Sequence, residues 1–357
     1  MSKSKKVFVI GAGINGLCTA WALVRRGYEV EVFERGGIPN LVSSSYDEHR
    51  ITRHAYGTMH AYADKMPEAF RLWEQLFADI GARHLDERPQ ILFQRGPEPW
   101  VDASIVDLDR FGLGWRDLSL GEVADRYPMI RMDGMTRAVS IDGSGILFPI
   151  RILTDLVVHL GAKGVTFHQS ADVSDIDPEN ARLTVGGTVH EADHLVIAAG
   201  AWVLRLLPEL AGEATPSRQA VLFLSPPVEL AAAWREAPIF LDLGNDSTTY
   251  MLPPRPGTRL KIGDHIFTRQ GDPDAPRVAT DEDCARLMDY GTRALAGFDR
   301  YTILERKACY YTVTDTEDFV IRPVGGKATV VSACSGHGFK LAPHSGEEAA
   351  RLVDAAG

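Results

Sequence analysis

The order of apolar and polar residues predicts a strand, a helix and a second strand at the start of the chain. Residues 7–10 form an unbroken apolar run, which is typical of a parallel strand buried on both faces. A helix is expected over 17–26, ended by Gly27, and a second strand over 28–33. This order predicts a βαβ unit.

The rest of the chain alternates between the two patterns. Helices are expected over 66–80, 100–113, 120–127, 149–160, 281–295 and 347–355. Strands are expected over 90–94, 165–176, 193–202, 318–323 and 328–333, with a hairpin of 182–185 and 188–190 about Gly186-Gly187. Apolar and polar residues alternate in four runs that are bounded by Pro and Gly, namely 220–224, 239–243, 248–251 and 259–263. This pattern predicts an antiparallel sheet.

Three glycines follow the first strand at the G-x-G-x-x-G spacing: Gly11, Gly13 and Gly16. One permits a tight turn, one lets backbone approach a pyrophosphate, and one lets the helix pack on the strand. The helix N-terminus then favours phosphate, and Glu34 can accept ribose hydroxyls at the end of the second strand. One alternative is a glycine-rich turn that binds no nucleotide. The other is a signal peptide, which the acidic residues after the apolar run disfavour.

Small residues end the run 193–202, at Gly200 among others. Small side chains at the carboxyl end of a strand in an α/β sheet let a ligand approach. The nucleotide-binding sheet is therefore expected to continue here, far from its first strands.

Composition limits the classes of partner. The 357 residues carry a formal net charge of −10, which argues against nucleic-acid binding, and no apolar stretch is long enough to predict a membrane span. The four cysteines form no C-x-x-C pair and no metal-ligand cluster, so we expect reduced thiols, a cytoplasmic protein and no metal.

The segment 43–54 is dense in hydroxyl and guanidinium groups. Beside a bound dinucleotide, such groups can contact phosphate oxygens or a substrate carboxylate. The alternative is a solvated polar loop.

The chain resembles the flavin-dependent amine oxidases of the D-amino-acid-oxidase superfamily, within the branch of monomeric sarcosine oxidase and N-methyltryptophan oxidase. The resemblance covers both ends and the middle of the chain. It is carried by G-x-G-x-x-G with Glu34-Arg35, Ser44-Ser45, Arg50-x-x-Arg53 and the segments 144–148, 200–202, 260–265, 309–312 and 334–340.

The resemblance implies an α/β fold of mixed α+β character, with an FAD-binding Rossmann-like domain and a discontinuous antiparallel-sheet substrate domain. The FAD domain is expected to comprise 1–84, 146–215 and 316–357, and the substrate domain 85–145 and 216–315. We expect a monomer.

The implied cofactor is FAD, bonded through its 8α carbon to the sulfur of Cys309. Without the resemblance, Cys309 is typical of an ordinary buried cysteine. The residues expected to bind FAD are Gly11, Gly13, Ile14, Asn15, Gly16, Glu34, Arg35, Ser44, Ser45, Arg50, Val173, Gly200, Trp202, Cys309, Gly336, His337, Gly338, Phe339 and Lys340.

The resemblance also implies catalytic roles. Lys261 would favour superoxide formation when dioxygen reoxidises the flavin, and His265, on the same side of that strand, would lie near the substrate. Arg53 and Lys340 would grip a substrate carboxylate. Tyr250 and Tyr311 would line the substrate cavity. The alternative for Lys261 is a solvated strand lysine, and for His265 a core histidine. The alternative for Arg53 and Lys340 is structural ion pairing, and for the two tyrosines it is packing in the core.

Three residues depart from the family pattern: Tyr46, His49 and Cys334. We expect all three to lie near the flavin or its substrate and to bear on which amine is oxidised.

The predicted function is oxidation of a secondary or N-methylated amino acid, cyclic ones included. Hydride transfer to FAD gives an imine, and reoxidation by dioxygen gives hydrogen peroxide. The alternatives are a dehydrogenase that uses another electron acceptor, an NAD-dependent reductase, and a flavoprotein that binds ligand without turnover.

Overall fold

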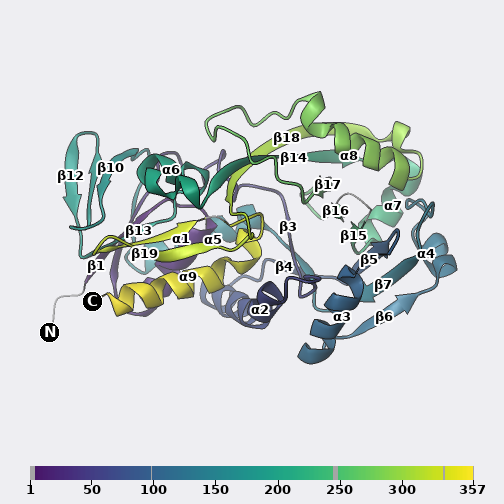
Figure 1. The fold of residues 1–357 in the computed structure, drawn as a ribbon, viewed down its shortest axis with the longest axis horizontal. Helices are drawn as coiled ribbons and strands as arrows, with labels where there is room; N and C mark the ends of the chain where they lie inside the picture. Colours follow the sequence, from purple (N-terminus) through teal and green to yellow (C-terminus); the bar gives the residue numbers. More distant parts are fainter. Residues whose placement is uncertain (1–4, 98, 244–247, 333, 357) are drawn as a thin grey trace.

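The computed structural model describes residues 5–97, 99–243, 248–332 and 334–356, and two sheets organise it (Figure 1). The first sheet is parallel except for one edge strand, β19, which is antiparallel to its neighbour. Its strands, in spatial order, are β19 (Val320–Val324), β20 (Ala328–Ser332), β13 (His194–Ile197), β1 (Lys6–Ile10), β2 (Glu29–Phe33) and β9 (Thr166–His168).

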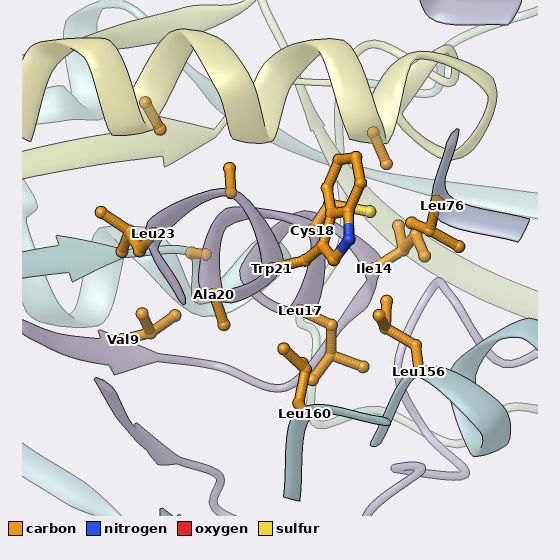
Figure 2. Close-up of a cluster of buried hydrophobic side chains, with 14 of the residues drawn as sticks. Val9, Ile14, Leu17, Cys18, Ala20, Trp21, Leu23, Leu76, Leu156 and Leu160 are labelled. Carbon is orange, nitrogen blue, oxygen red and sulfur yellow. The ribbon is translucent and has the colours of Figure 1, made fainter. Parts of the chain in front are cut away.

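The helix α1 (Ile14–Arg25) is the centre of the core beside this sheet. Figure 2 shows Trp21 directed toward α9 (Gly338–Ala355), while Leu17 points toward Leu156 and Leu160 of α5 (Pro149–Ala162). Each such buried side chain contributes about 1.5–3 kcal/mol. A Cβ on Gly346 of α9 would lie 2.6 Å from the backbone of α1, so glycine permits the close helix contact.

The second sheet is larger and mostly antiparallel, with one parallel pair between β15 and β5. Its strands, in spatial order, are β18 (Thr302–Val313), β14 (Thr215–Ser225), β17 (Leu260–Asp264), β16 (Thr248–Leu252), β15 (Ile239–Leu243), β5 (Gln90–Gln94), β7 (Arg137–Ile141) and β6 (Trp115–Leu118). Helix α8 (Asp281–Ala294) packs on this sheet and begins with a capping box of Thr280 and Asp283.

Smaller elements complete the described chain. A three-stranded sheet has the order β3 (Arg50–Thr52), β8 (Gly145–Leu147) and β4 (Leu85–Glu87), and another comprises β10 (Val173–Asp177), β11 (Arg182–Val185) and β12 (Thr188–Glu191). The other helices are α2 (His60–Ile80), α3 (Trp100–Phe111), α4 (Leu120–Arg126), α6 (Val203–Leu206) and α7 (Val228–Glu236). The short 3₁₀ turns are η1 (Gly200–Trp202), η2 (Pro208–Gly212) and η3 (Phe298–Arg300).

The predicted fold class is confirmed, and so are the βαβ unit and the hairpin about Gly186-Gly187. The expected strand over 165–176 was wrong, because its two halves join different sheets as β9 and β10. Helix α2 begins at His60, earlier than the expected 66, and Pro67 accounts for the difference because proline is typical of the first turn of a helix. Residue 333, which ends an expected strand, lies outside the described residues.

We propose the expected bounds for two domains. The strands of the first sheet come from 1–84, 146–215 and 316–357, and those of the second, apart from the first residue of β14, from 85–145 and 216–315. Among the described helices, none is both long enough and apolar enough to cross a membrane.

The glycine turn is fixed by close backbone contacts. Gly11 has a φ of +103°, and a Cβ on it would lie 2.4 Å from the carbonyl oxygen of Ala198. A Cβ on Gly16 would lie 1.9 Å from the carbonyl oxygen of Gly11. Because an added Cβ at either glycine would meet backbone atoms, no flexible side chain could move to make room for it.

We predict that Gly16→Ala lowers the free energy of unfolding by about 3 kcal/mol or more, because the methyl group must displace backbone. Chemical denaturation measures it. The matched control is Gly161→Ala in α5, where an added Cβ meets nothing within 4 Å, and which should change stability by at most about 1 kcal/mol, in the stabilising direction. Equal effects of the two substitutions would contradict this account.

Candidate active site

A cavity of about 420 Å³ is lined by both sheets. At one end it reaches the glycine turn and the carboxyl ends of β1 and β2, and at the other it reaches β16, β17 and β18. All the residues expected to bind FAD line this cavity except Gly16, which packs beneath the turn. The six residues with expected catalytic roles, Lys261, Arg53, Lys340, His265, Tyr250 and Tyr311, line it as well.

The nucleotide end is shaped for an anion. The N-termini of α1 and α9 both lie at the cavity wall, where free N–H groups and the helix dipoles favour negative charge. The hydroxyl of Ser45 accepts a hydrogen bond from the backbone N–H of Ile14 at 3.0 Å. The buried Oδ1 of Asn15 has no hydrogen-bond partner among the described residues. This end therefore leaves both space and polar groups for a dinucleotide.

Glu34, which was expected to accept ribose hydroxyls, also forms a hydrogen bond with the glycine turn. Its Oε2 accepts from the backbone N–H of Ala12 at 2.8 Å, and its Oε1 accepts from Asn40 Nδ2 at 2.8 Å and Gly36 N at 3.0 Å. The acid thus holds the glycine turn and the loop after β2 together.

An acid that the sequence did not single out, Asp274, joins the loop before α8 to residues beside the glycine turn and η1 at this end. It accepts hydrogen bonds from Trp202 Nε1 at 2.7 Å and from an Arg35 nitrogen at 3.0 Å, and it also pairs with Arg205. These hydrogen bonds, above all the one from Trp202, lower the pKa of Asp274 to about 2. Its position in an aperiodic loop gave no sequence signal.

Lys261 lies at the centre of the cavity wall and is fully buried. Its Nζ donates to Asp47 Oδ2 at 2.5 Å and to the carbonyl oxygen of His49 at 3.3 Å. Asp47 is also buried and pairs with Arg50 at 2.7 Å. Burial lowers the pKa of Lys261 to about 8, against the opposing effect of Asp47.

Cys309 lies on β18 and lines the cavity. Burial raises the pKa of its thiol, while the nearby positive charge of Arg50 acts in the opposite direction. The second thiol in the cavity wall is that of Cys334.

Arg53 and Lys340 form the most unusual feature of the cavity. Both are buried, and neither makes an ion pair with any carboxylate that the structure describes. The Nζ of Lys340 lies 3.3 Å from His337 Nδ1, and the Nε of Arg53 has no partner among the described residues. Burial lowers the pKa of both side chains. Two basic side chains held this way fit an anionic ligand, whose negative charge would favour their protonated forms.

A carboxylate bridges two histidines beside these cations. Glu317 Oε2 lies 2.9 Å from His265 Nε2 and 3.3 Å from His337 Nε2. Although burial alone would raise the pKa of Glu317, its hydrogen bonds with the two histidines lower it to about 2. Glu317 has a φ of +64°, an unfavourable conformation for this residue type. The sequence reasoning missed it.

The two tyrosines stand where glycines leave room. A Cβ on Gly263, between Lys261 and His265 on β17, would lie 2.3 Å from the hydroxyl of Tyr250. A Cβ on Gly336 would lie 3.0 Å from the hydroxyl of Tyr311. Both phenol rings therefore lie against the chain segments that carry the other site residues.

Of the three departures from the family pattern, one lines the cavity. Cys334 does, whereas Tyr46 and His49 do not. Tyr46 is half-buried under Lys307, and the imidazole of His49 is fully buried with neither nitrogen hydrogen-bonded among the described residues. The expectation that these two side chains shape the substrate site finds no support in the cavity wall.

Comparison with known proteins identifies the family. The family model described as FAD dependent oxidoreductase matches residues 6–352. The chain belongs to this family. Its members bind FAD, and the cavity fits that cofactor because its glycine turn, two helix N-termini and the unpaired Asn15 oxygen meet at the nucleotide end.

Two groups of curated relatives match along nearly the whole length. Monomeric sarcosine oxidase of Bacillus sp. (strain B-0618) is 27% identical, over 99% of this chain and 93% of its own. N-methyl-L-tryptophan oxidase of Yersinia pestis (strain Pestoides F) is 27% identical, over 96% of this chain and 93% of its own.

Solved structures share the fold of this FAD dependent oxidoreductase. NikD, an amino acid oxidase of nikkomycin biosynthesis, matches with a TM-score of 0.81 at 21% identity, covering 99% of this chain and 94% of NikD. L-proline dehydrogenase of P. horikoshii matches with a TM-score of 0.83 at 18% identity, covering 99% and 94%. At these identities the likeness concerns the fold alone.

We predict that Glu317→Gln lowers stability in a pH-dependent way. A carboxyl whose pKa is about 2 when folded, against 4.5 as its ordinary value, stabilises the fold above pH 4.5 and loses this contribution as the pH falls toward 2. The unfolding temperature of the variant should therefore be lowered most near neutral pH, and the difference should shrink between about pH 5 and pH 3.

Thermal unfolding across that pH range measures the effect. Asp315→Asn is the matched control, because Asp315 lies on the same loop but is 97% exposed. It should lower the unfolding temperature little at any pH. A Glu317→Gln difference that stays constant with pH would contradict the bridging role.

Proposed function

We propose that this protein is an oxidase of secondary or N-methylated amino acids, cyclic ones included, and that it releases hydrogen peroxide. The single observation that carries the proposal is the pair Arg53 and Lys340, two buried basic side chains without a carboxylate partner among the described residues, in the FAD cavity. The full-length likeness to sarcosine and N-methyl-L-tryptophan oxidases supports it.

Arg53 and Lys340 would bind the substrate carboxylate. A guanidinium can bind both carboxylate oxygens at once, and the second cation adds attraction in a site that excludes water. Holding the carboxylate also fixes the neighbouring carbon and nitrogen, and such positioning can supply a large part of the rate. Tyr250 and Tyr311 would form the walls around the remainder of the substrate.

When bound, FAD would take a hydride from the carbon beside the substrate nitrogen and later pass two electrons to dioxygen. The substrate amine must be uncharged for this chemistry. His265 lines the cavity, and both it and its partner Glu317 are part-exposed. The imidazole of His265 would accept the proton that an ammonium substrate gives up on binding, and the negative charge of Glu317 would stabilise the imidazolium.

The buried ammonium group of Lys261 would serve the second half of the reaction. A fixed positive charge in a dry site stabilises negative charge as it develops on oxygen. The acid of its ion pair, Asp47, keeps the lysine in the cavity wall.

Cys309 would hold FAD covalently. Its sulfur lies in the cavity wall near the charge of Arg50, which favours the thiolate that forms the bond. Cys334 is the competing thiol of the same wall.

We predict that the purified protein carries flavin that survives acid precipitation, and that its mass exceeds the mass of the chain by one FAD. Cys309→Ser should lose the added mass, because a hydroxyl is far less nucleophilic than a thiol. Cys334→Ser is the control and should retain it. Mass spectrometry decides between them, and flavin retained by Cys309→Ser but lost in Cys334→Ser would reassign the bond.

We predict that an N-methyl or cyclic amino acid bleaches the flavin without oxygen, and that air restores its colour with release of peroxide. Lys261→Met should be reduced normally but reoxidise about a hundredfold more slowly, because it lacks the charge. Lys340→Met, the matched control from the same cavity, should show the opposite division: weak substrate binding and normal reoxidation.

Stopped-flow absorbance measures the two half-reactions, and a peroxide assay measures the product. Reduction without peroxide in air would favour the alternative, a dehydrogenase with another electron acceptor. Equal losses of both half-reactions in Lys261→Met would remove the role given to Lys261.

A further inference from the structure

Asp47 is a buried acid between two cations. Its side chain is 3% exposed, and its Oδ2 lies 2.5 Å from Lys261 Nζ and 2.7 Å from an Arg50 nitrogen. Asp47 and Arg50 come from the segment 43–54 that follows the nucleotide-binding turn, whereas Lys261 comes from β17 in the second sheet. The hydrogen-bonded ion pair between Asp47 and Lys261 thus joins the two halves of the cavity, and the pair between Asp47 and Arg50 holds Asp47 within its own segment.

The other groups around Lys261 do not supply negative charge. Arg50 and Lys307, the latter on β18, are cations that oppose a charge on Lys261. His49 offers its carbonyl oxygen at 3.3 Å, and its buried imidazole has a pKa lowered by burial to about 3, so it is neutral. Cys309 on β18 also faces this group, and burial raises the pKa of its thiol. Among the described residues, Asp47 is the carboxylate that pairs with Lys261.

Burial of an ammonium group without an acid favours loss of its proton. Lys261 is fully buried, and two further cations act on it. Its charge at neutral pH therefore depends on the carboxylate in contact with it. The cavity position of Lys261 alone does not make it a cation.

We propose that Asp47 sets the charge of Lys261 and thereby the pH range in which the protein reduces dioxygen. Asp47 acts through Lys261 and is a positioning residue. The inference rests on the proposed function, because it assumes that Lys261 serves reoxidation of the flavin.

The test compares Asp47→Asn with the unchanged holoenzyme. The charged lysine exists below its pKa, so reoxidation of the unchanged protein should slow as the pH rises through about 8. In Asp47→Asn the same decline should occur about 1–3 pH units lower, since an adjacent opposite charge shifts a pKa by this amount. At pH 7.5 the variant should reoxidise about tenfold more slowly, and it should recover as the pH is lowered.

A second measurement does not depend on turnover. The midpoint potential of the bound flavin, measured against pH, should change slope where Lys261 titrates, because a nearby cation favours the reduced, more negative cofactor. The slope change should lie near pH 8 in the unchanged protein, lower in Asp47→Asn, and be absent in Lys261→Met.

Two further variants control for structural effects. Asp242→Asn removes a different buried carboxylate, which lies on β15 of the second sheet. Asp242 is also ion-paired, with Arg95, but it does not line the cavity. It should reduce stability and leave the pH profile of reoxidation unchanged. Asp47→Glu keeps the negative charge and should keep the decline closer to pH 8 than Asp47→Asn, and it replaces that variant if the amide does not fold.

The outcomes are separable. If Lys261→Met reoxidises normally, the role of Lys261 in the proposed function fails. If Lys261→Met is slow but Asp47→Asn and Asp47→Glu both keep the unchanged pH profile, the inference about Asp47 is overturned. It is also overturned if Asp47→Asn is as slow as Lys261→Met at every pH, because the carboxylate would then place the lysine without setting its charge.

Discussion

The burial of positive charge is the constraint on which the cavity depends. Arg50, Arg53, Lys261 and Lys340 all face it, and among the described residues one carboxylate, that of Asp47, forms ion pairs with any of them. An unpaired buried cation costs several kcal/mol, so the surrounding fold must supply the stability that keeps these groups in place. The packed layer of α1, α5 and α9 supplies much of it. An anionic ligand then meets basic groups that are already fixed in place, and its charge favours their protonated forms.

Local patterns in the sequence were sufficient for the parts of the site built by neighbouring residues. The glycine turn follows from the spacing of Gly11, Gly13 and Gly16 after an apolar run. Lys261 lies on β17 and His265 follows directly after its end, where its backbone N–H still donates to the carbonyl oxygen of Thr248 on β16, so their shared side follows from the strand period. The identities of Arg53, Lys340 and Cys309 came from family resemblance rather than from any such pattern.

The acids that organise these residues could not be found in this way. Asp47 meets Lys261 across 214 positions, Glu317 meets His265 across 52, and Asp274 meets Trp202 across 72. Each lies in an irregular segment, where neither a helical nor a strand period marks which side chains turn inward. For the same reason the sequence did not indicate that Tyr46 and His49, expected near the flavin or its substrate, do not line the cavity. Long-range pairing is decided by tertiary packing.

The long separation in sequence between α1 and α9 has a consequence for biosynthesis. The side chains of α9 cover α1, and its first residues, Gly338 to Lys340, line the cavity. Strand β20 just before it pairs with β13 inside the first sheet. During translation, the βαβ unit therefore has an apolar face uncovered until α9 has left the ribosome. A nascent chain that still lacks α9 exposes this face, and the cofactor site is complete only after α9 has been made.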